Sequence, residues 1–170
     1  MKRTCALACL IVLSGCAFSA VRRVNFDQYG NSYRTTKHIE LEPTEALDEA
    51  RSALDGIGWE IASTNADLGI IHSKPRPVTL PDVCDCGTWN GDPVHGTGDF
   101  AFVVSVTPDG TGAKVTVDGQ CMTNFTGQNL YGATTRRETY RCASRGKPEN
   151  DFWTTLETVA ANRAARKAKG

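Results

Sequence analysis

Residues 100–118, Phe-Ala-Phe-Val-Val-Ser-Val-Thr-Pro-Asp-Gly-Thr-Gly-Ala-Lys-Val-Thr-Val-Asp, carry the clearest structural signal in the chain. From Phe100 to Thr107, large apolar residues alternate with smaller or polar ones, which is the period of a β-strand with one buried face. A turn follows at Pro108-Asp109-Gly110, and Val115 and Val117 return with the same alternation. These residues predict an antiparallel hairpin at the centre of a sheet.

Further strands are expected before and after this hairpin, because other segments combine alternation with β-branched and aromatic residues. The segments with this composition are 33–41, 59–63, 68–73 and 134–142. The turn-forming residues 65–67 join two of them into a second hairpin. The returning strand of the central hairpin is expected to reach about Met122, and the polar residues 124–129 predict a loop.

Two segments have the period of amphipathic helices. The first opens at Pro43 with Thr44 as its expected N-cap, and Gly56 is placed to end it in a left-handed conformation. The second follows Pro148 and is expected to be capped by Asn150 or Asp151. Their apolar faces must be buried, and they consist of Leu47, Ala50, Leu54 and Ile57 in the first helix and Phe152, Trp153, Leu156, Val159, Ala160 and Ala164 in the second.

The order strand, helix, strands, long loop, strands, helix predicts one α+β domain over residues 33–170. In this fold, two helices pack on one face of a single, mainly antiparallel sheet, and a long disulfide-stapled loop interrupts the strands. This arrangement of elements resembles the helix-grip domains of some bacterial envelope lipoproteins. The resemblance implies a fold and leaves the activity open, because one fold hosts many functions.

Residues 75–99 form the expected long loop, which begins with three prolines and is rich in glycine and aspartate. Loops of this length in compact domains are usually functional or disordered, and Cys84 and Cys86 argue against disorder. We therefore expect the loop to present Trp89 and His95 to a partner, since aromatic residues are favoured at interfaces. The structural alternative is that Trp89 packs on the disulfides.

The first sixteen residues have the features of a secretion signal. Lys2 and Arg3 precede an uncharged apolar run of about half the length that a membrane-spanning helix needs. The residues Leu13-Ser14-Gly15-Cys16 then resemble the lipobox of bacterial lipoproteins. The resemblance implies removal of residues 1–15 and acylation of Cys16 with fatty chains such as palmitate.

Residues 16–32 are then a lipidated N-terminus and a short tether. The sorting rule of lipoproteins, applied to Ala17 after the cysteine, implies an outer-membrane location facing the periplasm. The competing interpretation is an ordinary signal peptide cleaved after Ser19, where Ala17 and Ser19 are the small residues that cleavage needs.

Four cysteines remain after Cys5 and Cys9 leave with the signal and Cys16 is acylated: Cys84, Cys86, Cys121 and Cys142. An even number in an oxidising compartment predicts two disulfides. A bridge between Cys84 and Cys86 requires a strained turn, so each should reach a distant partner. We expect Cys84 to pair with Cys121 and Cys86 with Cys142, and the crossed pairing is the alternative. The functional alternatives for these cysteines are a zinc site or a redox pair, although zinc usually requires two-residue gaps or nearby histidines.

The charge balance of the sequence and its lack of known catalytic motifs narrow the range of possible functions. Lys and Arg number 19 and Asp and Glu number 19, so no global positive field favours nucleic acid. The sequence contains no nucleophile elbow, phosphate-binding glycine loop or histidine-glutamate zinc helix. We therefore expect a non-catalytic binding or assembly module, with no cofactor, held at the membrane by its lipid and contacting an envelope protein.

Two other functions remain open from the sequence. One is a small metal-dependent hydrolase that uses His72, His95 and loop aspartates such as Asp92, although their spacing does not match a calcium loop. The other is a carrier that holds an apolar ligand between the helices and the sheet.

Overall fold

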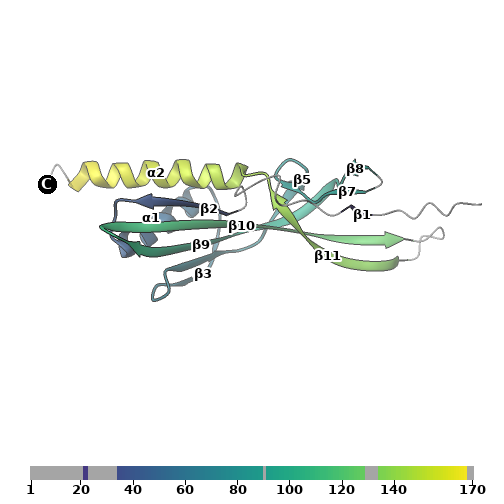
Figure 1. Ribbon diagram of the computed structural model, residues 1–170, viewed down its shortest axis with the longest axis horizontal. Coiled ribbons are helices and arrows are strands. Elements are labelled where there is room, and N and C mark those ends of the chain that lie inside the picture. Colours follow the sequence, from purple (N-terminus) through teal and green to yellow (C-terminus); the bar gives the residue numbers. More distant parts are fainter. Residues whose placement is uncertain (1–20, 23–33, 90, 129–133, 168–170) are drawn as a thin grey trace, which may run out of the picture.

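The computed structural model describes residues 21–22, 34–89, 91–128 and 134–167 (Figure 1). The predicted central hairpin is present as β9 (Gly96–Asp109) and β10 (Gly112–Gln128), which pair in antiparallel register. Phe100, Phe102, Val104 and Val106 of β9 are buried, and the residues between them are only partly buried. The alternation in the sequence therefore correctly identified one buried face.

The outer edge of β9 is shared by two shorter strands. β4 (Ile70–Ser73) pairs with β9 around Val104, and β5 (Arg76–Leu80) pairs with the beginning of β9. β3 (Ile61–Asn65) pairs with β4 and forms the edge of the sheet on this side. The expected hairpin of residues 59–73 is thus confirmed, with its strands two residues shorter at their starts.

The outer edge of β10 is shared in the same way. β2 (Arg34–Ile39) pairs with the first half of β10, and β11 (Thr134–Ser144) pairs with the second half. β6 (Cys84–Asp85) then pairs with the end of β11. The result is an eight-stranded antiparallel sheet with the β9–β10 hairpin as its spine.

A second, small sheet lies beside one end of the large one. It consists of β1 (Val21–Arg22), β7 (Thr88–Trp89) and β8 (Asp92–Pro93), in the order β1, β7, β8. Figure 1 shows these strands at the opposite end of the domain from the C-terminus of α2 (Lys147–Lys167). The domain is therefore elongated along the direction of β9 and β10.

Both helices pack on the same face of the large sheet, as predicted. α1 (Pro43–Gly56) contacts β9, β10, β3 and β4, and α2 lies beside α1 and against β10 (Figure 1). Side-chain contacts join α2 to β2: the Trp153 indole N–H donates to Thr35 Oγ1 over 2.6 Å, and Lys37 Nζ pairs with Glu157 Oε1 at 2.6 Å. The fold is α+β with two helices on one face of a single large sheet.

Aromatic rings fill the space between the helices and the sheet. The Phe102 ring centroid lies 5.1 Å from that of Phe100, 4.9 Å from that of Trp59 and 6.1 Å from that of Phe152. Burying each such side chain contributes about 1.5–3 kcal/mol of transfer free energy. Leu54, Ile71, Leu156, Val104, Val115 and Val117 complete this layer and are fully buried.

The helix boundaries correct three expectations. Pro43 is the first helical residue of α1, so Glu42 is the N-cap and Thr44 lies inside the first turn. The left-handed residue after α1 is Gly58, with φ 75°, and Gly56 remains helical. α2 begins at Lys147, and the Asn150 N–H already donates to the Gly146 carbonyl over 2.9 Å, so neither Asn150 nor Asp151 is the cap.

Two loop expectations were also wrong. Residues 124–128, expected in a loop, belong to β10 because β11 supplies a pairing partner for their polar backbone. The long loop of residues 75–99 contains the short strands β5, β6, β7 and β8. Short strands have little alternation to detect, and they become stable only when a distant strand pairs with them.

Candidate functional site at the disulfide-linked end of the sheet

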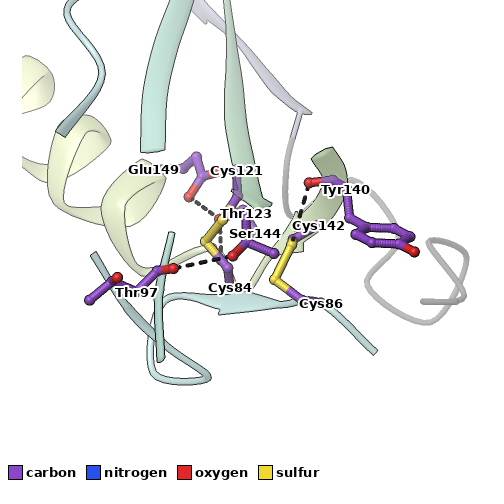
Figure 2. Close-up of a disulfide and its surroundings, with 10 residues drawn as sticks. Cys84, Cys86, Thr97, Cys121, Thr123, Tyr140, Cys142, Ser144 and Glu149 are labelled. Carbon is purple, nitrogen blue, oxygen red and sulfur yellow. Dashed lines mark hydrogen bonds between the residues drawn. A yellow bond between two sulfur atoms is a disulfide. The ribbon is translucent and has the colours of Figure 1, made fainter. Parts of the chain in front are cut away.

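Two disulfides join β6 and the residue after it to β10 and β11 (Figure 2). Cys84 is bonded to Cys121 of β10 and Cys86 to Cys142 of β11, so the expected pairing is confirmed. Cys121 and Cys142 are direct partners in the β10–β11 register. Cys84 and Cys86 are two positions apart on an extended segment, so both face the same side, and two neighbouring bonds form.

Backbone hydrogen bonds fix the cysteine-bearing loop further. The Arg145 N–H donates to the Val83 carbonyl over 2.8 Å, and the Val94 N–H donates to the Gly87 carbonyl over 3.0 Å. The Gly87 N–H also donates to Asp85 Oδ1 over 2.7 Å. The loop between β5 and β9, apart from residue 90, is consequently held in place by backbone hydrogen bonds.

The N-terminal side of the chain attaches at the same place. Val21 pairs with Trp89 and Arg22 with Thr88, so β1 and β7 form an antiparallel pair. Trp89 follows Cys86 by three positions, and Cys86 is bonded to the large sheet. A segment close to the expected lipid attachment site is therefore joined to the disulfide-linked end.

A buried carboxyl group lies near the disulfides, beside Ser144 and Gly119. Glu149, in the first turn of α2, is fully buried, and Ser144 Oγ donates to its Oε2 over 2.8 Å (Figure 2). Its Oε1 has no hydrogen-bond partner among the residues that the structure describes. Burial is the largest influence on this group and raises the pKa of Glu149 from 4.5 to about 7.

Smaller influences on the pKa of Glu149 act in both directions. The hydrogen bonds from Ser144 and from the backbone N–H of Glu149 lower the pKa, and the nearby Asp118 carboxylate raises it. Because burial outweighs the hydrogen bonds, the Glu149 carboxyl is protonated in part of the folded molecules at neutral pH.

Room for this carboxyl exists because residue 119 of β10 is glycine. A Cβ atom at Gly119 would overlap Glu149 Oε1 and lie 2.7 Å from Phe100 Cζ. The absence of a side chain at Gly119 therefore makes the space into which Glu149 fits.

The variant Gly119→Ala tests this packing. The added methyl group displaces the Glu149 carboxyl and the Phe100 ring, and overpacking of this kind lowers the free energy of unfolding by about 1–3 kcal/mol. Urea denaturation followed by circular dichroism measures the loss. Gly56→Ala is the control, because its Cβ meets only the end of one side chain, Thr155 Cγ2 at 3.3 Å, and should destabilise the fold much less than Gly119→Ala does. Equal stabilities for the two variants contradict this account.

The structure describes one of the two predicted binding residues, His95, completely, and only the backbone of the other, Trp89. His95 is exposed between β8 and β9. The backbone of Trp89 belongs to β7, and its side chain lies outside the part of the chain that the structure describes. The predicted signal, Cys16 and tether lie in residues 1–33, of which the structure describes only residues 21–22.

The residues of the hydrolase hypothesis are not brought together. His72 is exposed on β4 opposite Val103, whereas His95 adjoins Gly96 at the start of β9. Val103 and Gly96 are seven positions apart on one strand, which corresponds to about 23 Å. Within the described ranges, no three His, Cys, Asp or Glu side chains are grouped to hold a metal ion.

Two surface hollows beside α1 bear on the carrier hypothesis. The two hollows have volumes of about 560 and 530 Å³; charged and polar side chains line most of the first, and the second combines Val159 and Ala165 with charged and polar residues. The lining residues are Asp48, Arg51, Ser52, Asp55, Glu60 and Ile61 in one and Glu49, Ser52, Val159, Asn162, Ala165 and Arg166 in the other. Apolar ligands bind in sites lined mainly by apolar side chains.

Sequence reasoning missed Glu149, Gly119 and the β1–β7 pairing. A glutamate in the first turn of a helix is common on exposed surfaces, because it faces the positive end of the helix dipole. Nothing near Glu149 in the sequence indicates burial, and a two-residue strand such as β1 has no detectable period. The four cysteines were the only local signal for this site.

Comparison of the chain with protein-family models and with curated proteins gives no match. Across the ranges that the structure describes, no helix has the length and apolar character needed to cross a membrane. The functional argument therefore depends on this chain's own residues.

Proposed function

We propose that this protein is a bacterial envelope lipoprotein whose folded domain is a non-catalytic binding or assembly module. The observation that carries the proposal is the sequence Leu13-Ser14-Gly15-Cys16 at the end of a short apolar run. In lipoproteins this pattern directs acylation of the cysteine. The lipid on Cys16 anchors the domain, on our proposal, to the periplasmic face of the outer membrane.

The disulfides support export. Stable disulfides form in oxidising compartments and are rare in the cytosol. All four cysteines of the domain are paired with one another, and Cys5 and Cys9 belong to the proposed signal. Cys16 is then the one cysteine of the mature chain that remains for modification.

The shape of the sheet supports a binding or assembly role. Both helices cover one face, and the other face carries partly buried Ala101, Val103 and Ser105 at its centre and Met122, which is 43% exposed, near the disulfide-linked end. A broad sheet face of mixed polarity is suited to contact with another protein, since most interfaces are about as apolar as the rest of a protein surface.

Metabolic labelling with a fatty-acid analogue tests the anchor. We expect the wild-type protein to incorporate the label and to sediment with membranes, and Cys16→Ser to lose both properties completely. Cys9→Ser is the matched control, because it makes the same substitution within the leader and should keep the label. Mass spectrometry of the mature N-terminus can detect the outcome that contradicts the proposal. An unmodified chain that begins at Ala20 would show cleavage by the ordinary signal peptidase route and refute the proposal.

A further inference from the structure

We propose that the disulfide-linked end of the domain is held against the lipid headgroups of the membrane, with the turn between β9 and β10 pointing away. This inference depends on the proposed acylation of Cys16. It assigns a lipid surface, and not a protein partner, to the exposed residues around β7 and β8.

The length of chain between the anchor and the first paired residue is the main argument. Val21 follows Cys16 by five positions, and five fully extended residues span at most about 17 Å. Without the β1–β7 pairing, the first residue of the sheet after Cys16 is Arg34, eighteen positions away and within reach of about 60 Å. The pairing thus shortens the free tether to less than a third.

A continuous set of bonds connects this short tether to the core. Val21 pairs with Trp89 of β7, and β7 pairs with β8. The same loop is bonded through Cys86 to Cys142. A tether that ends on β1 therefore keeps this end of the domain near the anchor, because β7 begins two residues after Cys86, which is bonded to the large sheet.

The long axis of the domain makes the two ends distinguishable. β9 contains 14 residues and begins beside β8, so its far end at Asp109 lies about 45 Å from its start. Figure 1 shows β1, β7 and β8 at one end and the C-terminus of α2 at the other. A tether of about 17 Å attached at one end holds that end near the membrane, and the far end lies about 45 Å farther away when the domain stands upright.

The exposed residues at the membrane-facing end favour contact with headgroups over insertion into the hydrocarbon. Asp92, Pro93 and His95 are exposed there, and a charged carboxylate is costly to transfer into an apolar phase. The fatty chains supply the attachment. The free face of the large sheet and the far turn then remain accessible to an envelope protein.

Energy transfer in vesicles tests the orientation. Lipidated full-length protein is reconstituted in phosphatidylethanolamine and phosphatidylglycerol vesicles that contain an acceptor-labelled headgroup. A fluorescent non-natural amino acid replaces either Asp92 or Thr111, both of which are exposed. The donor and acceptor fluorophores are chosen so that their characteristic transfer distance is shorter than the length of the domain. We then expect the efficiency of energy transfer to be several-fold greater from position 92 than from position 111.

A strand-breaking variant tests the cause. Successive residues of a strand direct their backbone N–H groups to opposite edges, so one of Val21 and Arg22 must face β7. The double variant Val21→Pro/Arg22→Pro removes both N–H groups and should abolish most of the difference in transfer between positions 92 and 111. Val21→Ala/Arg22→Ala keeps both N–H groups and should preserve the difference.

The outcomes separate this inference from the function on which it depends. If Cys16 of the purified protein carries no fatty chains, the proposed anchor and the proposed orientation are both overturned. A lipidated protein with equal transfer from the two positions, or greater transfer from position 111, overturns the orientation and leaves the lipoprotein proposal standing.

Discussion

Replacing Cys84 and Cys121 together by alanine should lower the free energy of unfolding by about 4 kcal/mol, from the loop-closure entropy of a bridge of this span. The two cysteines are separated by 37 positions, and both are fully buried, so the loss of packing adds to the effect. Cys86→Ala/Cys142→Ala removes a bridge that spans 56 positions, and its loss should be similar. Net stabilities of single domains are about 5–15 kcal/mol, so removing both bridges should remove more than half of the stability of a typical domain.

A mismatched pair of substitutions is the control for this prediction. Cys84→Ala/Cys142→Ala removes the same number of cysteines but breaks both native bridges. We expect it to unfold at a clearly lower urea concentration than either matched pair. If the mismatched variant is as stable as the matched ones, the pairing or its energetic role is incorrect.

Raising the pH through the range from about 4.5 to about 7 should destabilise the folded state through Glu149. Below this range the carboxyl is neutral in both states, and above it the carboxyl is charged in both. Within it, the folded state binds the proton more tightly, because burial raises the pKa of Glu149 to about 7. The unfolded state then binds fewer protons than the folded state, so stability falls with pH.

The difference between the two pKa values corresponds to about 3 kcal/mol once the range has been crossed. Glu149→Gln keeps the shape of the side chain and removes the titration. Relative to wild type, we expect Glu149→Gln to gain up to this amount between pH 4 and pH 8 in urea denaturation series. A stability difference that stays constant over this range would falsify the assignment.

Glu157→Gln provides the matched control for the pH series. Glu157 lies on the same helix, its carboxylate is about half exposed, and it pairs with Lys37. Exposed ion pairs contribute about 0–1 kcal/mol, so the variant should follow the wild-type pH dependence closely. The comparison isolates the effect of burying a carboxyl from the effect of removing a charge.

Much of the large sheet could be predicted because its signals are local. The alternation between Phe100 and Thr107 identified β9 and its buried face, and the recurring apolar residues of both helices identified the surfaces that pack on the sheet. The absence of a Cys84–Cys86 bridge was also within reach of the sequence, because such a bridge requires a strained turn, whereas the choice between the two remaining pairings required the structure. The structure adds that Cys121 and Cys142 are direct neighbours on adjacent strands.

The candidate site could be predicted only in part. Its cysteines were identified, but β1 and β7 consist of two residues each, and such strands exist only through pairing with a partner far along the chain. The extension of β10 through polar residues to Gln128 has the same origin, because β11 satisfies its backbone hydrogen bonds.

By itself, the amino-acid sequence determined where one face of each long element must be buried, because the spacing of apolar side chains is a property of neighbouring residues. It also determined the four cysteines that are oxidised. Only the tertiary structure decided that Glu149 is buried opposite Gly119 and that the N-terminal segment pairs with the cysteine-bearing loop. Those features depend on contacts between distant parts of the chain, and the free energy of such contacts is set by the environment that the complete fold creates.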